Sequence, residues 1–106
     1  MDEAAARRVL GLVGLGVRAR GVVVGVDRVR EAVRSGRCRL ALVAEDAGPH
    51  SREKVLPLCA ARGVTVVDGW QADALGQAAG KERTAVVGVT DPQLAKGIRG
   101  ALDSGR

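Results

Sequence analysis

The chain has 106 residues and a formal net charge of +5, with 46% hydrophobic and 27% charged residues. This length predicts one domain over residues 1–106 with short flexible ends at residues 1–4 and 103–106, and the composition excludes a disordered chain. No apolar run approaches the roughly 20 residues that a membrane helix needs, and the N-terminus MDEAAARR lacks the pattern of a signal peptide, so we expect a cytoplasmic protein.

The first predicted element is a helix at about residues 3–18, which Gly11, Gly14 and Gly16 interrupt. Each glycine costs a helix on the order of 1 kcal/mol relative to alanine, so we expect close packing against a neighbouring element to compensate. The sequence GLVGLG lacks the spacing of a dinucleotide-binding loop and follows a helical pattern instead of a strand. We therefore interpret this segment as a closely packed helix.

A short β-branched strand is predicted at residues 22–24, followed by a tight turn at Gly25 and a second helix. We expect Gly25 to have a positive φ and to direct the amides of residues 26–28 outward. The helix should bury one face, since its apolar residues recur at helical spacing. The residues predicted on that face are Val26, Val29, Ala32, Val33 and Gly36.

Three more helices are predicted further along the chain. The third should start near Ser51 and end at Gly63, with Pro57 kinking or restarting it. The fourth, QADALGQAAG, closes at its final glycine. In the last helix Asp91 is the predicted cap and Pro92 takes the first helical position, which its fixed φ suits. The buried stripe of this helix is expected to hold Leu94, Ile98 and Leu102.

The remaining strands are predicted at residues 39–45, 64–67 and 84–89. Their apolar runs are continuous and not alternating, which is typical of a sheet that is covered on both faces. We therefore predict the α/β class, with helices on both sides of the sheet in a three-layer α/β/α sandwich. The residues expected to be buried are Leu40, Leu42, Val43, Val66, Val86 and Val87.

Positive charge is concentrated in one part of the chain. Between Arg18 and Arg39 lie seven arginines and only two acidic residues, so this span carries a net charge of +5, equal to that of the whole chain. Arginines outnumber lysines 14 to 3, and the guanidinium fork suits phosphate groups. The pattern favours an anionic partner, with nucleic acid as the first class and a simply solvated basic face as the alternative.

Chemistry-bearing residues do not form a catalytic or metal-binding pattern. The two thiols of Cys38 and Cys59 lie beside apolar residues, so we interpret both as small buried hydrophobes, and His50 lies in a turn. The adjacent Glu45 and Asp46 end a strand, where α/β folds place function, but loop carboxylates also satisfy backbone amides. We expect no enzymatic activity, no cofactor and no small-molecule substrate.

Trp70 is the only aromatic residue. Binders of single-stranded RNA usually stack bases on several aromatic side chains, which this chain lacks. Any RNA that it binds should therefore be folded, and should be held through phosphates, 2′-hydroxyl groups and a helix N-terminus. We interpret Trp70 as a partly buried anchor near the fourth helix.

The order and spacing of three segments resemble a known family. The segments are GVDRVREAVRSGRCRLALVAEDA, LPLCAARGV and ALGQAAGKERTAVVGVTD, and the resemblance covers roughly residues 7–102. The chain resembles the ribosomal protein L-seven-Ae family, and most of all its small stand-alone bacterial branch. The resemblance implies a four-stranded mixed sheet in an α/β/α sandwich. It also implies a non-enzymatic protein that binds structured RNA, kink-turn RNA included, on the ribosome or in translation.

The resemblance also implies where RNA would bind, namely at the N-terminus of the second helix and in the loop before the last strand. The family's turn glycine corresponds to Gly25, its asparagine to Asp27, its glutamate to Arg28, its helix lysine to Glu31 and its basic loop residue to Arg83. Asp27 and Glu31 depart from the family in charge, which weighs against strict kink-turn recognition and leaves generic RNA binding as the expectation. The full set of expected RNA-binding residues is Arg18, Arg20, Gly25, Val26, Asp27, Arg28, Glu31, Arg34, Lys81 and Arg83.

Glu31 lies three residues from both Arg28 and Arg34, so we expect ion pairs within the helix to hold it. Arg28 is then the side chain that takes over from the family's lysine. The expected partners are structured RNA, with ribosomal RNA first, and ribosomal or other proteins. The alternative function is a protein–protein interaction module on the same fold, since the family's relatives include stress proteins that act through partners.

Overall fold

A computed structural model describes residues 1–104. Residues 105 and 106, in the C-terminal end that we expect to be flexible, lie outside the described residues, and both flexible ends stay predictions. The elements in chain order are α1 (Glu3–Arg18), β1 (Val22–Val24), α2 (Val26–Arg34), β2 (Leu40–Val43), α3 (Pro49–Ala61), β3 (Val66–Val67), α4 (Ala72–Ala79), β4 (Val86–Val89) and α5 (Pro92–Ser104). Not one of these helices is both long enough and apolar enough to cross a membrane.

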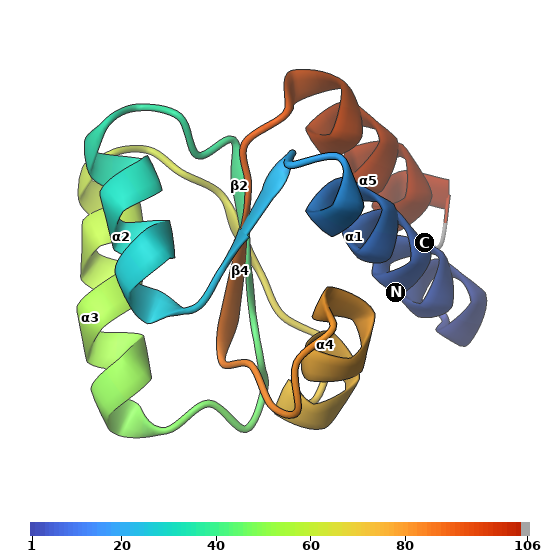
Figure 1. The fold of residues 1–106 in the computed structure, drawn as a ribbon, viewed down its shortest axis with the longest axis horizontal. Helices are drawn as coiled ribbons and strands as arrows, with labels where there is room; N and C mark the ends of the chain where they lie inside the picture. Colours follow the sequence, from blue (N-terminus) through green and yellow to red (C-terminus); the bar gives the residue numbers. More distant parts are fainter. Residues whose placement is uncertain (105–106) are drawn as a thin grey trace.

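The strands form one four-stranded sheet in the order β1-β4-β2-β3. β2 and β3 are parallel, while β4 pairs antiparallel with both β1 and β2. Helices α2 and α3 cover one face of this sheet and α1, α4 and α5 cover the other, as Figure 1 shows. The predicted α/β/α sandwich with a mixed sheet is confirmed.

Every predicted strand is present, and the last three are shorter than predicted. Their flanking residues still pair, since the amide of Arg39 donates to Val89 O at 2.7 Å and that of Ala41 donates to Thr65 O at 3.0 Å. The predicted runs therefore begin before the regular ladder in all three strands, and in β2 the run also continues past its end, so the run alone overestimates strand length.

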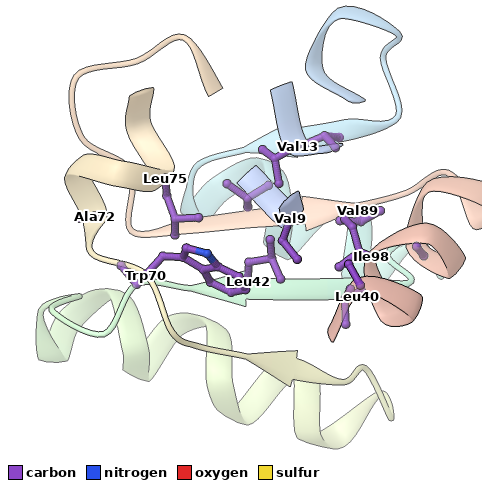
Figure 2. Close-up of a cluster of buried hydrophobic side chains, with 14 residues drawn as sticks. Val9, Val13, Leu40, Leu42, Trp70, Ala72, Leu75, Val89 and Ile98 are labelled. Atoms are coloured by element: carbon purple, nitrogen blue, oxygen red, sulfur yellow. The ribbon is translucent and has the colours of Figure 1, made fainter. Parts of the chain in front are cut away.

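Both faces of the sheet are buried because side chains alternate along β2 and β4. Leu40, Leu42, Val87 and Val89 belong to the cluster under α1, α4 and α5, and Figure 2 shows part of that cluster. The opposite cluster, under α2 and α3, contains Ala41, Val43 and Val86. Five of the six predicted core residues are buried, whereas Val66 is only half-buried, so that prediction was wrong. Its strand, β3, lies at the sheet edge and has two residues.

Helix faces differ in detail from the prediction. In α2 the buried residues are Val29, Ala32 and Val33, while Val26 is half-buried and Gly36 is exposed beyond the helix end. Helix α3 starts at Pro49, two residues before Ser51, and Pro57 lies within one continuous helix.

In α5 the deepest positions are Ala95, Ile98 and Ala101, and the predicted Leu94 and Leu102 are half-buried. The two leucines still pack against the cluster under α1, α4 and α5, and Leu94 reaches the α1 backbone at Gly16. Asp91 caps the helix as predicted, since its Oδ2 accepts a hydrogen bond from the Leu94 amide at 2.8 Å.

The glycines of α1 allow close packing at two of the three predicted positions. A methyl group on Gly16 would overlap Leu94 and Val22, and one on Gly14 would lie 3.3 Å from Ala78 O in α4. Gly11 faces open space, so the expectation of close packing was wrong there.

Trp70 and the two cysteines are part of the core. Trp70 is 4% exposed, and its Nε1 donates to Ala6 O at 3.0 Å, which ties the segment before α4 to α1. Cys38 and Cys59 are buried as predicted, and burial raises the pKa of both thiols. A raised thiol pKa lowers the thiolate fraction, which suits packing residues and not nucleophiles.

Candidate nucleic-acid interface

The turn between β1 and α2 is built on Gly25, which has φ 99° and ψ 158°. The positive φ predicted for Gly25 is confirmed. This combination of φ and ψ is essentially restricted to glycine. The first intrahelical bond runs from the Val29 amide to Gly25 O at 3.0 Å. Gly25 offers no side-chain cap, so the amides of residues 26–28 have no acceptor within the helix and remain available to an external anion.

A groove of about 580 Å³ runs along β1, one of the two edge strands of the sheet. Three cations predicted as RNA ligands, Arg20, Arg28 and Lys81, line it together, and no carboxylate of residues 1–104 does. Arg20 has φ 60° and is, within residues 1–104, the one non-glycine residue with a positive φ. Such strain is uncommon and often marks functional positions. The other lining residues are Val17, Val22, Val23, Val24, Ala79 and Gly80.

The open edge of β1 adds backbone groups to the groove. Gly21 O accepts from the Thr90 amide at 2.9 Å, and the Gly25 amide donates to Val86 O at 3.0 Å. The backbone hydrogen-bonding groups of Gly21 and Gly25 therefore point toward β4, inside the sheet. Backbone groups alternate in direction along an antiparallel strand, so the intervening Val22 and Val24 direct their N–H and C=O groups to the open edge. We call this groove together with the Gly25 turn the β1–α2 surface.

Arg83, in the loop between α4 and β4, is held by acidic side chains. Its guanidinium donates to Asp46 Oδ2 and to Asp73 Oδ1, both at 3.2 Å. Asp46 Oδ1 also accepts from the Ala72 amide at 2.8 Å, so the prediction that a loop carboxylate satisfies a backbone amide is confirmed. That amide, with help from Arg83, lowers the pKa of Asp46. The two carboxylates offset the charge of Arg83, and an RNA contact by this residue stays a prediction.

The acidic residues of α2 are exposed and unpaired. Within residues 1–104 neither Asp27 nor Glu31 takes part in an ion pair, so the expected pairing of Glu31 with Arg28 and Arg34 was wrong. Exposed pairs gain little in water and cost side-chain entropy, so their absence is unsurprising.

The seven arginines between residues 18 and 39 do not share one surface. Arg20 and Arg28 line the groove, whereas Arg34 lies in the last turn of α2, at the end away from the Gly25 turn (Figure 1). Arg18 lies in the last turn of α1 and does not line the groove. Arg30 Nη1 donates to Lys54 O and so joins α2 to α3.

A family of known proteins matches most of this chain. The family model described as the ribosomal protein L7Ae/L30e/S12e/Gadd45 family matches residues 7–98. The chain belongs to this family. The matched span contains the groove, the Gly25 turn and the loop with Arg83, and the resemblance expected from the sequence is confirmed.

Among proteins similar to this L7Ae-family member is the RNA-binding protein YlxQ of Bacillus subtilis (strain 168). It is 38% identical over 92 residues, which make up 87% of this chain and 92% of that protein. A solved protein with unknown function from Bacillus halodurans C is 32% identical with a TM-score of 0.83, over 91% of this chain and 97% of that one. The 15.5kD RNA binding protein of Giardia lamblia is 24% identical with a TM-score of 0.81, over 99% of this chain and 90% of that one. The two proteins share the same fold.

Sequence reasoning missed part of the site in this L7Ae-family member. It did not anticipate that β1 is an edge strand, because strand order depends on pairing partners that a single sequence does not display. It also did not include the six uncharged lining residues, Val17, Val22, Val23, Val24, Ala79 and Gly80. A signal for Gly80 was present, since the helix was predicted to close there, and Gly80 has the φ of 75° that such an end requires.

Proposed function

We propose that this protein binds structured RNA through the β1–α2 surface. The observation that carries the proposal is the convergence of Arg20, Arg28 and Lys81 on a groove that has no carboxylate in its lining. Membership of the family and similarity to a relative named as RNA-binding support the same partner class.

The chemistry of the surface suits the sugar–phosphate backbone. Guanidinium groups bind phosphate through two parallel hydrogen bonds, and the positive end of α2 attracts an anion to its free amides. The N–H groups at the open edge of β1 can donate to phosphate or ribose oxygens in the same groove. Trp70 is buried, so the protein reads shape and backbone instead of stacking on exposed bases.

The finer proposal is a kink-turn RNA in the ribosome or another translation complex in the cytoplasm, which the family resemblance supports. Asp27 and Glu31, exposed on α2 beside Arg28, weigh against strict kink-turn recognition. Both repel phosphate, so affinity for a kink-turn should rest on the groove cations and on Gly25. Within the site predicted from the sequence, Arg20, Arg28 and Lys81 are therefore the main contacts, and Arg18 and Arg34 contribute at longer range.

The proposal is tested by replacing Arg28 and Lys81 with alanine together. Neither side chain forms a hydrogen bond or ion pair in residues 1–104, so folding should not change. Each lost phosphate contact reduces the slope of log affinity against log salt by about 1, so we expect a reduction of about 2 for a folded RNA. The control is the double variant Arg7→Ala and Arg8→Ala, which removes the same charge from the exposed face of α1. Equal slopes for the two variants would contradict the proposed site.

A further inference from the structure

A second basic concavity, of about 600 Å³, lies where α2 and α3 end and α5 begins. Figure 1 shows these helix ends at the opposite end of the sheet from the Gly25 turn. Four exposed cations line it, Arg39, Arg62, Lys96 and Arg99, again without a carboxylate. They come from three separate parts of the chain, so the fold and not local sequence gathers them.

Two of these guanidinium groups are held in place without being neutralised. Arg62 Nη1 donates to Arg34 O at 3.0 Å, and Arg99 Nη2 donates to Arg39 O at 2.9 Å. A bond to a neutral carbonyl orients a guanidinium and leaves its charge and its other N–H groups available. This differs from Arg83, whose two bonds both go to carboxylates.

The other two cations are free in the described part of the chain. The side chains of Arg39 and Lys96 form no hydrogen bond or ion pair within residues 1–104. Four like charges around one concavity repel one another, and a bound polyanion relieves that repulsion. The last carbonyls of α2 would oppose an anion here, but Arg62 covers one of them through its bond to Arg34 O.

The floor of the concavity leaves room for a ligand. Gly36 and Gly63, with φ of 75° and 68°, follow α2 and α3, and a Cβ on either would meet open space. Buried Val33, Cys38 and Ala95 close the base. Above this base the apolar lining is limited to half-buried Val64 and exposed Pro92. Met1 and Leu15, the exposed large hydrophobic residues within residues 1–104, lie elsewhere, so the concavity offers few of the apolar anchors that protein interfaces use.

We propose that this second concavity binds the phosphodiester backbone of RNA, so that one molecule holds two RNA segments at two sites that share no lining residue. Three of its four cations are arginines, whose guanidinium fork binds phosphate through two parallel hydrogen bonds. A carboxylate-bearing protein surface could pair with the same forks, but a protein interface also needs apolar contacts at its centre. The inference rests on the proposed function for its class of partner, but it uses none of the residues of the β1–α2 surface.

The test is a titration of the ¹⁵N-labelled full chain with a short RNA duplex, in which the amide chemical shifts are measured at each step. Gly25, Asp27 and Lys81 report on the β1–α2 surface, and Gly36, Gly63 and Arg99, which the variant below leaves unchanged, report on the second concavity. We expect both sets to shift. The double variant Arg39→Ala and Lys96→Ala should lose the second set alone and reduce the salt slope by about 2. The Arg7→Ala and Arg8→Ala control should keep both sets.

The outcomes separate the two proposals. Shifts only at the β1–α2 surface would overturn the second site and leave the proposed function standing, while shifts only at the second concavity would support the second site and count against the proposed one. Loss of neither set in the Arg39→Ala and Lys96→Ala variant would also overturn the second site. So would stronger shifts there from a poly-glutamate peptide, or equal shifts from inorganic phosphate at the same phosphate concentration, since neither probe is an RNA backbone.

Discussion

At the scale of single residues, the candidate site depends most on a backbone conformation. Gly25 is the N-cap of α2 and Gly48 is the N-cap of α3, yet their φ values are 99° and −66°. Only the first lies where side chains other than glycine are strained. The identity of Gly25 therefore sets the direction of the free amides at the start of α2.

Replacing Gly25 with valine should lower the free energy of unfolding by about 1–3 kcal/mol and weaken RNA binding, because the turn must leave its native conformation. Gly48→Val is the matched control, since it changes the other N-cap glycine with open space around it and without the strain. Urea denaturation and filter binding measure the two effects. Similar losses of stability in both variants, or unchanged RNA affinity in Gly25→Val, would show that the conformation of this turn does not matter.

Replacing Glu31 with lysine restores the charge that the resembling family carries at that position. If α2 faces a kink-turn, affinity for a kink-turn RNA should rise more than affinity for a plain duplex, because the new ammonium meets a specific phosphate. Glu53→Lys on α3 makes the same charge change at an exposed position outside the groove. Equal gains in affinity for both RNAs would show that Glu31→Lys acts by nonspecific electrostatic attraction, and would contradict the kink-turn proposal.

At the scale of elements, the loop after β2 positions α4 and the loop that follows it. Asp46 accepts from the first amide of α4 at 2.8 Å and pairs with Arg83 at 3.2 Å. Arg52 adds bonds from α3 to Ala44 O, Glu45 O and Ala47 O, so this loop is fixed from two sides. Because Lys81 lies in the next loop, the contacts of Asp46 also help to place a groove cation.

The lowered pKa of Asp46 gives a pH dependence with a definite sign. A carboxylate with a depressed folded-state pKa contributes stability above its ordinary pKa of 3.8 and loses it as the pH falls through the folded-state value. Asp46→Asn should therefore be less stable than the native protein at pH 7, and the difference should shrink below about pH 4. Thermal unfolding from neutral to acidic pH measures this, with Asp68→Asn as the charge-matched control. A difference that is independent of pH would contradict the role of the carboxylate charge.

The sequence predicts the layers well and the edges poorly. Continuous apolar runs reveal a doubly covered sheet because every position on β2 and β4 is buried. They do not reveal where the ladder stops, so Val66 was placed in the core although it lies on an edge strand. In the same way charge counting found Arg28 and the family resemblance found Lys81, but neither could show that Arg83 is paired, since Asp46 lies 37 residues away in the chain.

At the scale of the whole molecule, positive charge collects at two places that share no lining residue. The β1–α2 surface lies along one edge strand, and the second concavity lies at the far end of α2 and α3. The dense run of arginines between residues 18 and 39 supplies cations to both, with Arg20 and Arg28 at one and Arg39 at the other. A cluster in the sequence is thus divided in the fold, and RNA binding should depend on the total charge as well as on each site.

The salt dependence of RNA affinity in the native protein tests the central claim most directly. Three groove cations at about 0.9 released counterions per phosphate contact predict that log affinity falls with log salt at a slope of about −2.7 or steeper. A folded RNA that contains a kink-turn is the substrate, and filter binding over a series of salt concentrations is the readout. Affinity that does not change with salt, or no binding at low salt, would contradict RNA binding through phosphates and would favour a protein-interaction module on this fold.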